Sequence, residues 1–270
     1  MEKARDFVRK ILSLLMKPEM RILPGQLAFF LVITTIPLVA LIATLATALS
    51  ISTDSFSQIM NQTVPTEISS IMNSIISGDG MNFNIFIFYF SAFLLASNGT
   101  LSMINTSNEI YKVKPKSILN RRIKAILMIL ILVCLFMFLL LVPVFGGTIF
   151  SIIKQATGDG VIEQIIQEML VILKYPLIIL VLFINIKLMY VIAPDEEIPS
   201  NTTNKGSIFT TLCWILATEI FAFYIEKFAK YDVFYGSISN ILVLLLWVYL
   251  LSYIFVFGMV INASSYKKEE

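Results

Sequence analysis

The stretch FNIFIFYFSAFLLASNGTLSMINTSNEIYKV, residues 83–113, decides the fold class because it begins as an apolar run and ends polar. An apolar helix of about 20 residues is long enough to cross the hydrocarbon layer of a membrane. The polar side chains of this stretch recur at steps of three and four, so on a helix they share one face. That face carries Ser91, Leu95, Asn98, Ser102, Asn105 and Glu109. It is about 27 Å long at helical rise, and we expect it to be hidden from lipid.

The composition of the whole chain also indicates a membrane protein. The 270 residues are 57% hydrophobic and 14% charged, whereas about a quarter of a soluble domain is charged. Backbone groups cannot stay unpaired in lipid, so the long apolar runs are expected to be helices. The sequence therefore predicts an all-α integral membrane protein. Its six predicted transmembrane helices are Leu27–Leu49, Phe83–Asn105, Ile123–Ile149, Met169–Ile192, Gly206–Ile225 and Ile238–Ala263.

The distribution of basic residues predicts the orientation. Six Lys or Arg lie before the first span and six more in residues 112–124, whereas Ser50–Asn82 has none. By the positive-inside rule both termini are cytoplasmic, although the loop APDEEIPSNTTNK, which is then cytoplasmic too, is acidic. The predicted organisation is a cytoplasmic amphipathic segment (1–22), a six-helix membrane domain (23–263) and a cytoplasmic tail (264–270). Within the domain, loop 50–82 is external and the basic loop 106–122 is cytoplasmic.

Amphipathic patterns outside the spans predict surface helices. Residues 7–15 place their apolar side chains on one face, which favours a helix lying on the cytoplasmic membrane surface. Two external segments, 65–80 and 158–170, have the same helical period. They either cap the helix bundle or lie on the outer leaflet.

Several residues within the spans are unusual for a membrane interior. Lys174 and Glu219 fall at similar predicted depth, so we expect a charge pair, with a neutral Glu219 or snorkelling side chains as alternatives. Pro37 is expected to kink the first span, either as a hinge or as a packing feature. The chain has no histidine, and its two cysteines lie in apolar runs without metal-ligand spacing. We therefore expect no catalytic residues, no metal and no cofactor, and a protein that is not an enzyme.

Four stretches together resemble the YihY/virulence factor BrkB family of bacterial membrane proteins. They are LAFFLVITTIP (27–37), NEIYKV (108–113), YDVFYGSISN (231–240) and LLLWVYLLSYIFVFGMVINA (244–263), and the resemblance covers about residues 20–263. It implies a six-helix protein of the bacterial plasma (inner) membrane. The positions carried over from the family motifs are Pro37, Asn108, Tyr235, Gly236, Ser237 and Gly258. The family often has Gly-Ala-Glu in the last span, where this chain has Gly258-Met259-Val260.

Two functional hypotheses follow. The first is a transporter or flippase that moves a lipid or another amphiphile along the polar face of the second span. The alternative is a non-transporting scaffold for envelope assembly, in which that face is packed shut. The expected partners are membrane lipids, with a homo-oligomer or envelope-assembly proteins also open. The family has carried a ribonuclease BN label, but nothing in these residues predicts nuclease activity, and we expect no nucleic-acid partner.

Overall fold

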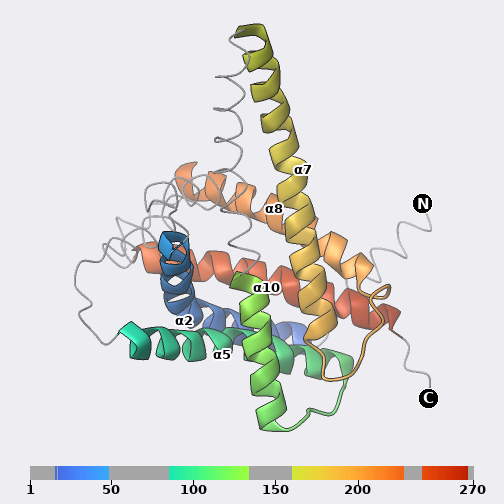
Figure 1. The fold of residues 1–270 in the computed structure, drawn as a ribbon. Helices are drawn as coiled ribbons and strands as arrows, with labels where there is room; N and C mark the ends of the chain where they lie inside the picture. The colour runs from blue at the N-terminus through green and yellow to red at the C-terminus, as the bar shows by residue number, and fades with distance from the viewer. Residues whose placement is uncertain (1–15, 17, 49–84, 134–159, 228–238, 267–270) are drawn as a thin grey trace, which may run out of the picture.

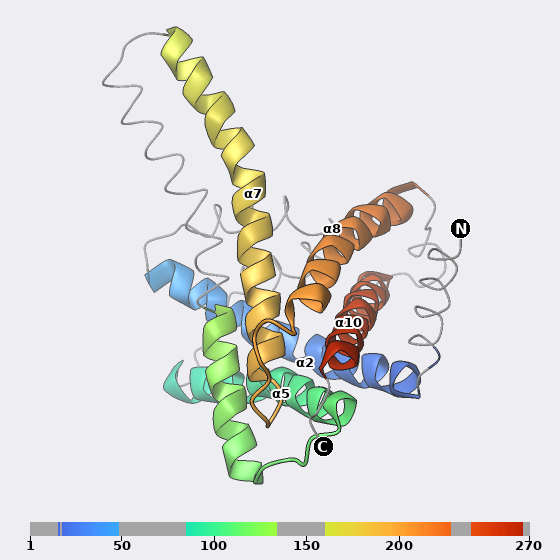
Figure 2. The same ribbon diagram turned by 90° about the vertical axis from the view of Figure 1, so that its right-hand side faces the viewer.

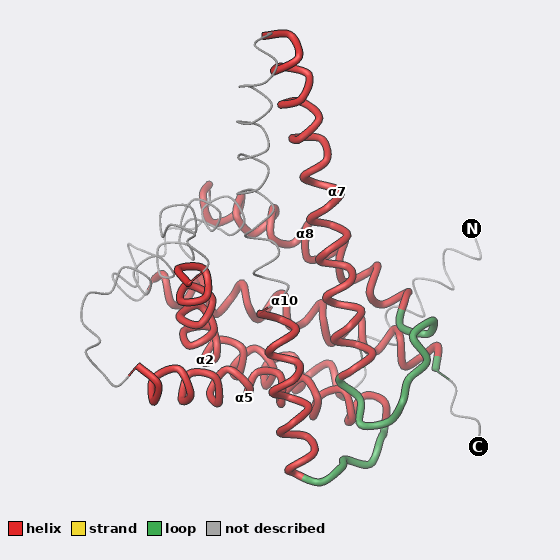
Figure 3. Tube along the Cα trace, in the orientation of Figure 1, coloured by secondary structure: helices red, strands yellow, loops and turns green. Residues whose placement is uncertain are grey.

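The structure is a computed structural model that describes residues 16, 18–48, 85–133, 160–227 and 239–266. Within these ranges, the side chains of residues 35–48, 85–90, 92, 160–175 and 240 are not described. The described residues form helices and loops without a strand, which confirms the predicted all-α class (Figure 3). The helices are α2 (Glu19–Ala48), α5 (Ile85–Tyr111), α7 (Gly160–Ile192), α8 (Asn204–Lys227) and α10 (Ser239–Ser265), with a further helix over residues 118–133.

The helices are longer than the predicted spans, and α5 illustrates why. It continues past the predicted end at Asn105 to Tyr111, where Lys112 adopts a left-handed φ of 56°. The amide of Val113 then donates to the carbonyl oxygen of Asn108 at 2.9 Å, which closes the helix with a Schellman-type cap. The next helix starts after Ser117, whose Oγ accepts the amide of Asn120 at 3.4 Å as an N-cap. Only residues 112–117 therefore connect the two helices.

Helix α7 differs from the sequence prediction of a surface segment followed by a separate span. Gly160 to Ile192 form one continuous helix of 33 residues, with Pro176 inside it. Neither glycine nor proline interrupts residues 161–175, so nothing in the sequence stops the helix between the two predicted elements. At helical rise this helix is about 50 Å long, longer than the hydrocarbon layer. Its N-terminal half projects beyond the other labelled helices (Figure 1).

The interior is built from buried side chains of α2, α5, α7, α10 and the helix of residues 118–133, with partly buried side chains of α8 packed against them. Helix α2 contacts α5 and α10, and α10 also contacts α8. The largest fully buried side chains of the core include Leu27, Ile104, Tyr190 and Phe255. Helix α7 and the helix of residues 118–133 run steeply across α2 and α5 rather than parallel to them (Figures 1 and 2). The helix of residues 118–133 thereby crosses the polar end of α5.

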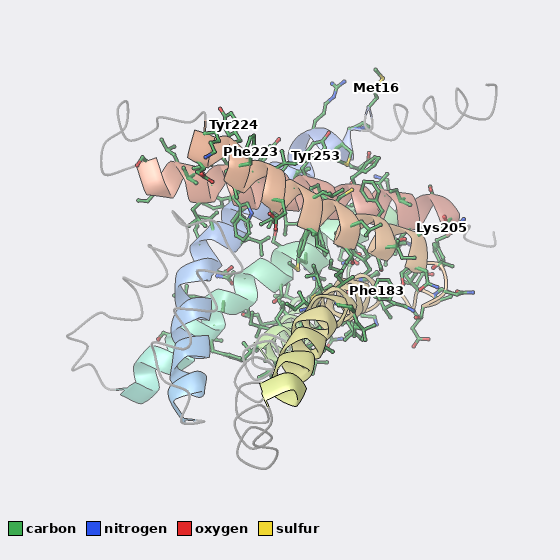
Figure 4. All side chains as sticks on the ribbon, turned by 90° about the horizontal axis from the view of Figure 1, so that it is seen from above. Met16, Phe183, Lys205, Phe223, Tyr224 and Tyr253 are labelled. Carbon is green, nitrogen blue, oxygen red and sulfur yellow. The ribbon has the colours of Figure 1, made fainter. Side chains whose placement is uncertain are left out.

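The outer surface is apolar along whole helix faces. On α8, Ile208, Leu212, Leu216 and Ile220 recur every four residues, and each exposes more than half of its surface. Figure 4 places Phe223 and Tyr224 near one end of this helix and Lys205 near the other. Two helices of the described part, Asn204–Lys227 and Ile241–Ser265, are long and apolar enough to cross a membrane. A continuous exposed apolar face of this kind is what a membrane-embedded helix presents to lipid.

Candidate functional site

The polar face of α5 meets two arginines from the next helix. Arg121 donates a hydrogen bond from Nη1 to Oδ1 of Asn105 at 2.6 Å. Arg122 donates from Nη1 to Oδ1 of Asn98 at 2.6 Å and from Nη2 to the carbonyl oxygen of Leu94 at 3.0 Å. Asn98 and Asn105 are seven residues apart, or about 10 Å along the helix. Two adjacent arginines thus contact the predicted polar face at two positions that are about two helical turns apart.

The other predicted members of this face are in different environments. Ser102 is buried, and its Oγ has no hydrogen-bond partner among the described residues. Ser91 and Glu109 are exposed, and Oε1 of Glu109 accepts a hydrogen bond from Nζ of Lys112 at 3.3 Å. The structure therefore joins Asn98 and Asn105 to charged partners, but it does not bring Ser91 or Glu109 to the same place.

A second polar cluster, which we call the Asp195 cluster, links α5 to the loop between α7 and α8. The side chain of Asp195 is only 1% exposed. Its Oδ2 accepts hydrogen bonds from Nδ2 of Asn108 at 2.7 Å and from the amide of Lys116 at 3.0 Å. Its Oδ1 accepts from Nζ of Lys124 at 3.1 Å, which is also an ion pair. Oδ1 of Asn108 in turn accepts a hydrogen bond from the backbone amide of Asp195 at 2.8 Å.

The cluster assigns a structural task to Asn108, which sequence analysis singled out only as part of a family motif. Asn108 stands on α5, Lys124 on the helix of residues 118–133, and Asp195 three residues after the end of α7. Nζ of Lys124 also donates to the carbonyl oxygens of Ala193 and Pro194. Sequence reasoning missed Asp195 and Lys124. The available signals were a lysine within an apolar run and an aspartate directly after a span.

The environment of Asp195 makes its charge dependent on pH. Burial disfavours the carboxylate, but hydrogen bonds from the Lys116 amide, Asn108 and Lys124, together with the Lys124 charge, outweigh burial. They hold the pKa of Asp195 below its ordinary value of 3.8. A group whose pKa is lower in the folded state stabilises that state above its unfolded pKa. This contribution is lost as the pH falls below 3.8 through the folded pKa.

We therefore expect the stability gap between the wild type and Asp195→Asn to depend on pH in the acid range. The gap in melting temperature should be constant near neutral pH and should narrow below pH 3.8, because the wild-type carboxylate becomes protonated there. Thermal unfolding of both proteins in the same detergent across this range measures it. An equal gap at neutral pH and well below the ordinary pKa would mean that the carboxylate charge does not contribute.

The family-motif residue Gly258 lies where α10 crosses α8. A Cβ atom at Gly258 would overlap Oγ1 of Thr210 and the hydroxyl of Tyr190, and one at Gly206 would overlap the carbonyl oxygen of Gly258. Tyr190, which is on α7, makes polar contacts with both crossing helices. The Tyr190 hydroxyl donates to the carbonyl oxygen of Phe255 at 2.8 Å and lies 2.7 Å from Oγ1 of Thr210. Two facing glycines therefore let the helix backbones touch, as in many membrane helix pairs.

The remaining predicted residues are not brought into either cluster. Glu219 is exposed on α8, whereas the Lys174 side chain is not among those described, so their pairing stays a prediction. Helix α2 continues through Pro37, whose side chain is likewise not described. Tyr235, Gly236 and Ser237 lie outside the described residues. Among the residues that are described, no three His, Cys, Asp or Glu are grouped so that they could hold a metal ion.

The exposed apolar helix faces and the polar contacts gathered inside them define the class as a helical membrane protein. Comparison of the sequence with protein families specifies it further. The profile of the family described as "Virulence factor BrkB" matches residues 15–270, nearly the whole chain. The chain belongs to this family, which confirms the resemblance found in the sequence motifs.

Individual relatives agree with this assignment. A Bacillus subtilis (strain 168) protein, YfkH, whose name calls it ribonuclease-like, is 28% identical over 273 residues, which cover 98% of this chain and 97% of that protein. The UPF0761 membrane protein IL2447 of Idiomarina loihiensis is 29% identical over 82 residues, 30% of this chain and 29% of that protein. A UPF0761 membrane protein of Pseudomonas aeruginosa (strain LESB58) is 32% identical over 80 residues, 29% of this chain and 20% of that protein. No solved structure matches the chain.

Proposed function

We propose that this protein crosses the bacterial plasma membrane six times, with both termini in the cytoplasm, and moves a lipid or another amphiphile between the leaflets. The polar face of α5 guides the headgroup, while the acyl chains stay in the surrounding lipid. In this arrangement Arg121, Arg122 and the Asp195 cluster lie at the cytoplasmic side. Membrane lipids are then both the solvent and the substrate of the protein.

The observation that carries the proposal is the position of the two arginines. Arg121 and Arg122 place two positive charges against the amides of Asn105 and Asn98, next to apolar helix surface. Among the described residues, neither arginine forms an ion pair with a carboxylate. Ionisable groups held within a membrane protein are costly, and they are typical of pathways for substrates or ions. A polar face lined with cationic groups suits an amphiphile with an anionic or zwitterionic headgroup.

A scaffold without transport activity is the second candidate, and the same region contains the observation that favours it. Asn98 and Asn105 already have partners in Arg122 and Arg121, and Ser102 is buried. Interhelical hydrogen bonds of this kind also serve packing alone, at about 0.6 kcal/mol each. In that case the polar face of α5 holds two helices together, and the protein acts by binding envelope-assembly partners or a second copy of itself.

Reconstitution separates these candidates. The purified full-length chain is placed in vesicles that carry fluorescent phospholipids, and the movement of lipid between leaflets and the leakage of a small solute are measured in the same preparation. We expect lipid movement above that of protein-free vesicles, without solute leakage. Lipid movement at the protein-free rate, with folded and correctly inserted protein, would contradict the proposal and favour the scaffold.

The name of the Bacillus relative raises nuclease activity as a further question. Our proposal does not include it, because the chain has no histidine to act as the commonest general base. Incubation of the purified protein with single-stranded RNA is expected to give no cleavage above a buffer control.

A further inference from the structure

Arg121 and Arg122 differ in how fully the protein uses their hydrogen-bond donors. A guanidinium carries five N–H donors in a planar fork. Arg122 donates to a side chain and to a backbone carbonyl of α5, which fixes it to that helix. Among the described residues, Arg121 donates only to Oδ1 of Asn105, and its buried Nε has no partner there. A buried N–H donor without an acceptor destabilises the folded protein, so Nε of Arg121 can still take an acceptor.

Three acidic side chains of the described part pair with lysines rather than with Arg121. Asp195 pairs with Lys124 at 3.1 Å, and Glu19 and Glu109 pair with Lys112 at 2.9 Å and 3.3 Å. The positive charge of Arg121 therefore faces a neutral amide rather than a carboxylate. Arg121 as a residue is also only partly buried, so it is not wholly enclosed by the protein.

We propose that Arg121 binds a phosphate-bearing anion, the phosphodiester headgroup of an anionic phospholipid, with Asn105 holding the guanidinium in place. This inference rests on the proposed function and names the substrate class of that site. A planar guanidinium offers two parallel N–H donors to one phosphate, a geometry that a lysine ammonium cannot reproduce. Arg122 is a positioning residue, since both of its bonds go to α5. An inorganic phosphate ion has the same recognition chemistry, and the test below distinguishes it from a lipid.

The test measures lipid adducts of the purified full-length protein by native mass spectrometry. Phosphatidylglycerol, phosphatidylcholine and inorganic phosphate are titrated separately onto the wild type, Arg121→Gln, Arg121→Lys and Lys114→Gln. Lys114 is an exposed lysine in the loop before Arg121, so its variant removes one charge nearby without touching the site. We expect Arg121→Gln to weaken phosphatidylglycerol binding about tenfold, as loss of a charge-assisted hydrogen bond predicts. Arg121→Lys should recover only part of it, and Lys114→Gln should bind like the wild type.

The outcomes separate this inference from the proposed function. Equal phosphatidylglycerol binding by the wild type and Arg121→Gln would overturn the inference, whether or not vesicles show lipid movement. If inorganic phosphate binds as tightly as phosphatidylglycerol and displaces it, the claim that the bound anion is a lipid headgroup is overturned. A loss of binding in Arg121→Gln supports the inference if the variant melts at the wild-type temperature without added lipid. If that loss occurs while wild-type vesicles show no lipid movement, the inference stands and the proposed transport fails.

Discussion

Replacing Asp195 by Asn is expected to lower the stability of the folded protein by about 3 kcal/mol, because it leaves the Lys124 ammonium without its counter-charge in a poorly hydrated site. Asp195 is 1% exposed and Lys124 is 21% exposed, so solvent screens the pair weakly. The substitution also weakens the acceptor for the Lys116 amide and for Asn108. The contacts that join α5, the helix of residues 118–133 and the loop after α7 are therefore weakened together.

Thermal unfolding in detergent or lipid nanodiscs measures this effect. Glu197→Gln is the matched control, because Glu197 lies two residues away in the same loop and is exposed. We expect the control to melt like the wild type. Combining Asp195→Asn with Lys124→Met should recover part of the loss, since the uncompensated charge is gone. An Asp195→Asn protein as stable as the wild type would refute the role assigned to the cluster.

Adding a single methyl group at Gly206 is expected to separate α8 from α10. The new Cβ would overlap the carbonyl oxygen of Gly258, a backbone atom that cannot rotate away, and would also press on Asn262 at 2.5 Å. The bond from the Gly206 amide to Oδ1 of Asn262, 2.7 Å long, would be lost as the helices move apart. We expect Gly206→Ala to lose about 3 kcal/mol of stability or to fail to accumulate in the membrane.

Gly25→Ala is the control for this substitution. A Cβ at Gly25 would have Tyr249 as its nearest neighbour at 3.9 Å, an ordinary van der Waals contact. Alanine is also the better helix former by about 0.8–1 kcal/mol, so this variant should be as stable as the wild type or more so. Thermal unfolding and the yield of membrane-inserted protein compare the two variants. Equal behaviour of both would show that the crossing tolerates a side chain at Gly206.

The sequence was sufficient to predict that these segments are helical, but not where α2 and α7 begin and not which helices contact each other. The apolar runs placed the predicted spans over Gly206–Ile225 and Ile238–Ala263 within two residues of the ends of α8 and α10. Periodicity also put Asn98 and Asn105 on one face of α5. It did not identify Arg121 and Arg122 as their partners, because a basic loop is explained equally well by membrane orientation. The angle at which one helix crosses another decides such contacts, and no local pattern encodes that angle.

The Asp195 cluster was missed for a related reason. Asp195 and Asn108 are 87 residues apart in the chain, and an acidic loop is ordinarily read as a solvated one. The continuity of α7 was missed because the change from an amphipathic to a uniformly apolar pattern was taken for a helix boundary. A single helix such as α7 gives the same change from an amphipathic to a uniformly apolar pattern when its two halves lie in different surroundings. Gly258, by contrast, was found through the family motif, and its close packing supplies the physical reason for a glycine there.

The central claim, that the polar face of α5 borders a passage rather than a sealed packing contact, is tested most directly by thiol accessibility at Ser102. In a chain whose two native cysteines are replaced, Ser102→Cys and Ser97→Cys are compared in vesicles with a membrane-impermeant maleimide. Ser97 is also buried on α5, but its Oγ donates to the carbonyl oxygen of Leu94 at 2.7 Å and it lies off the polar face. The structure buries both serines. We predict that Ser102→Cys nevertheless reacts, because lipid movement along the polar face must open it to water, and that Ser97→Cys does not. Protection of both cysteines in folded, inserted protein would contradict the account.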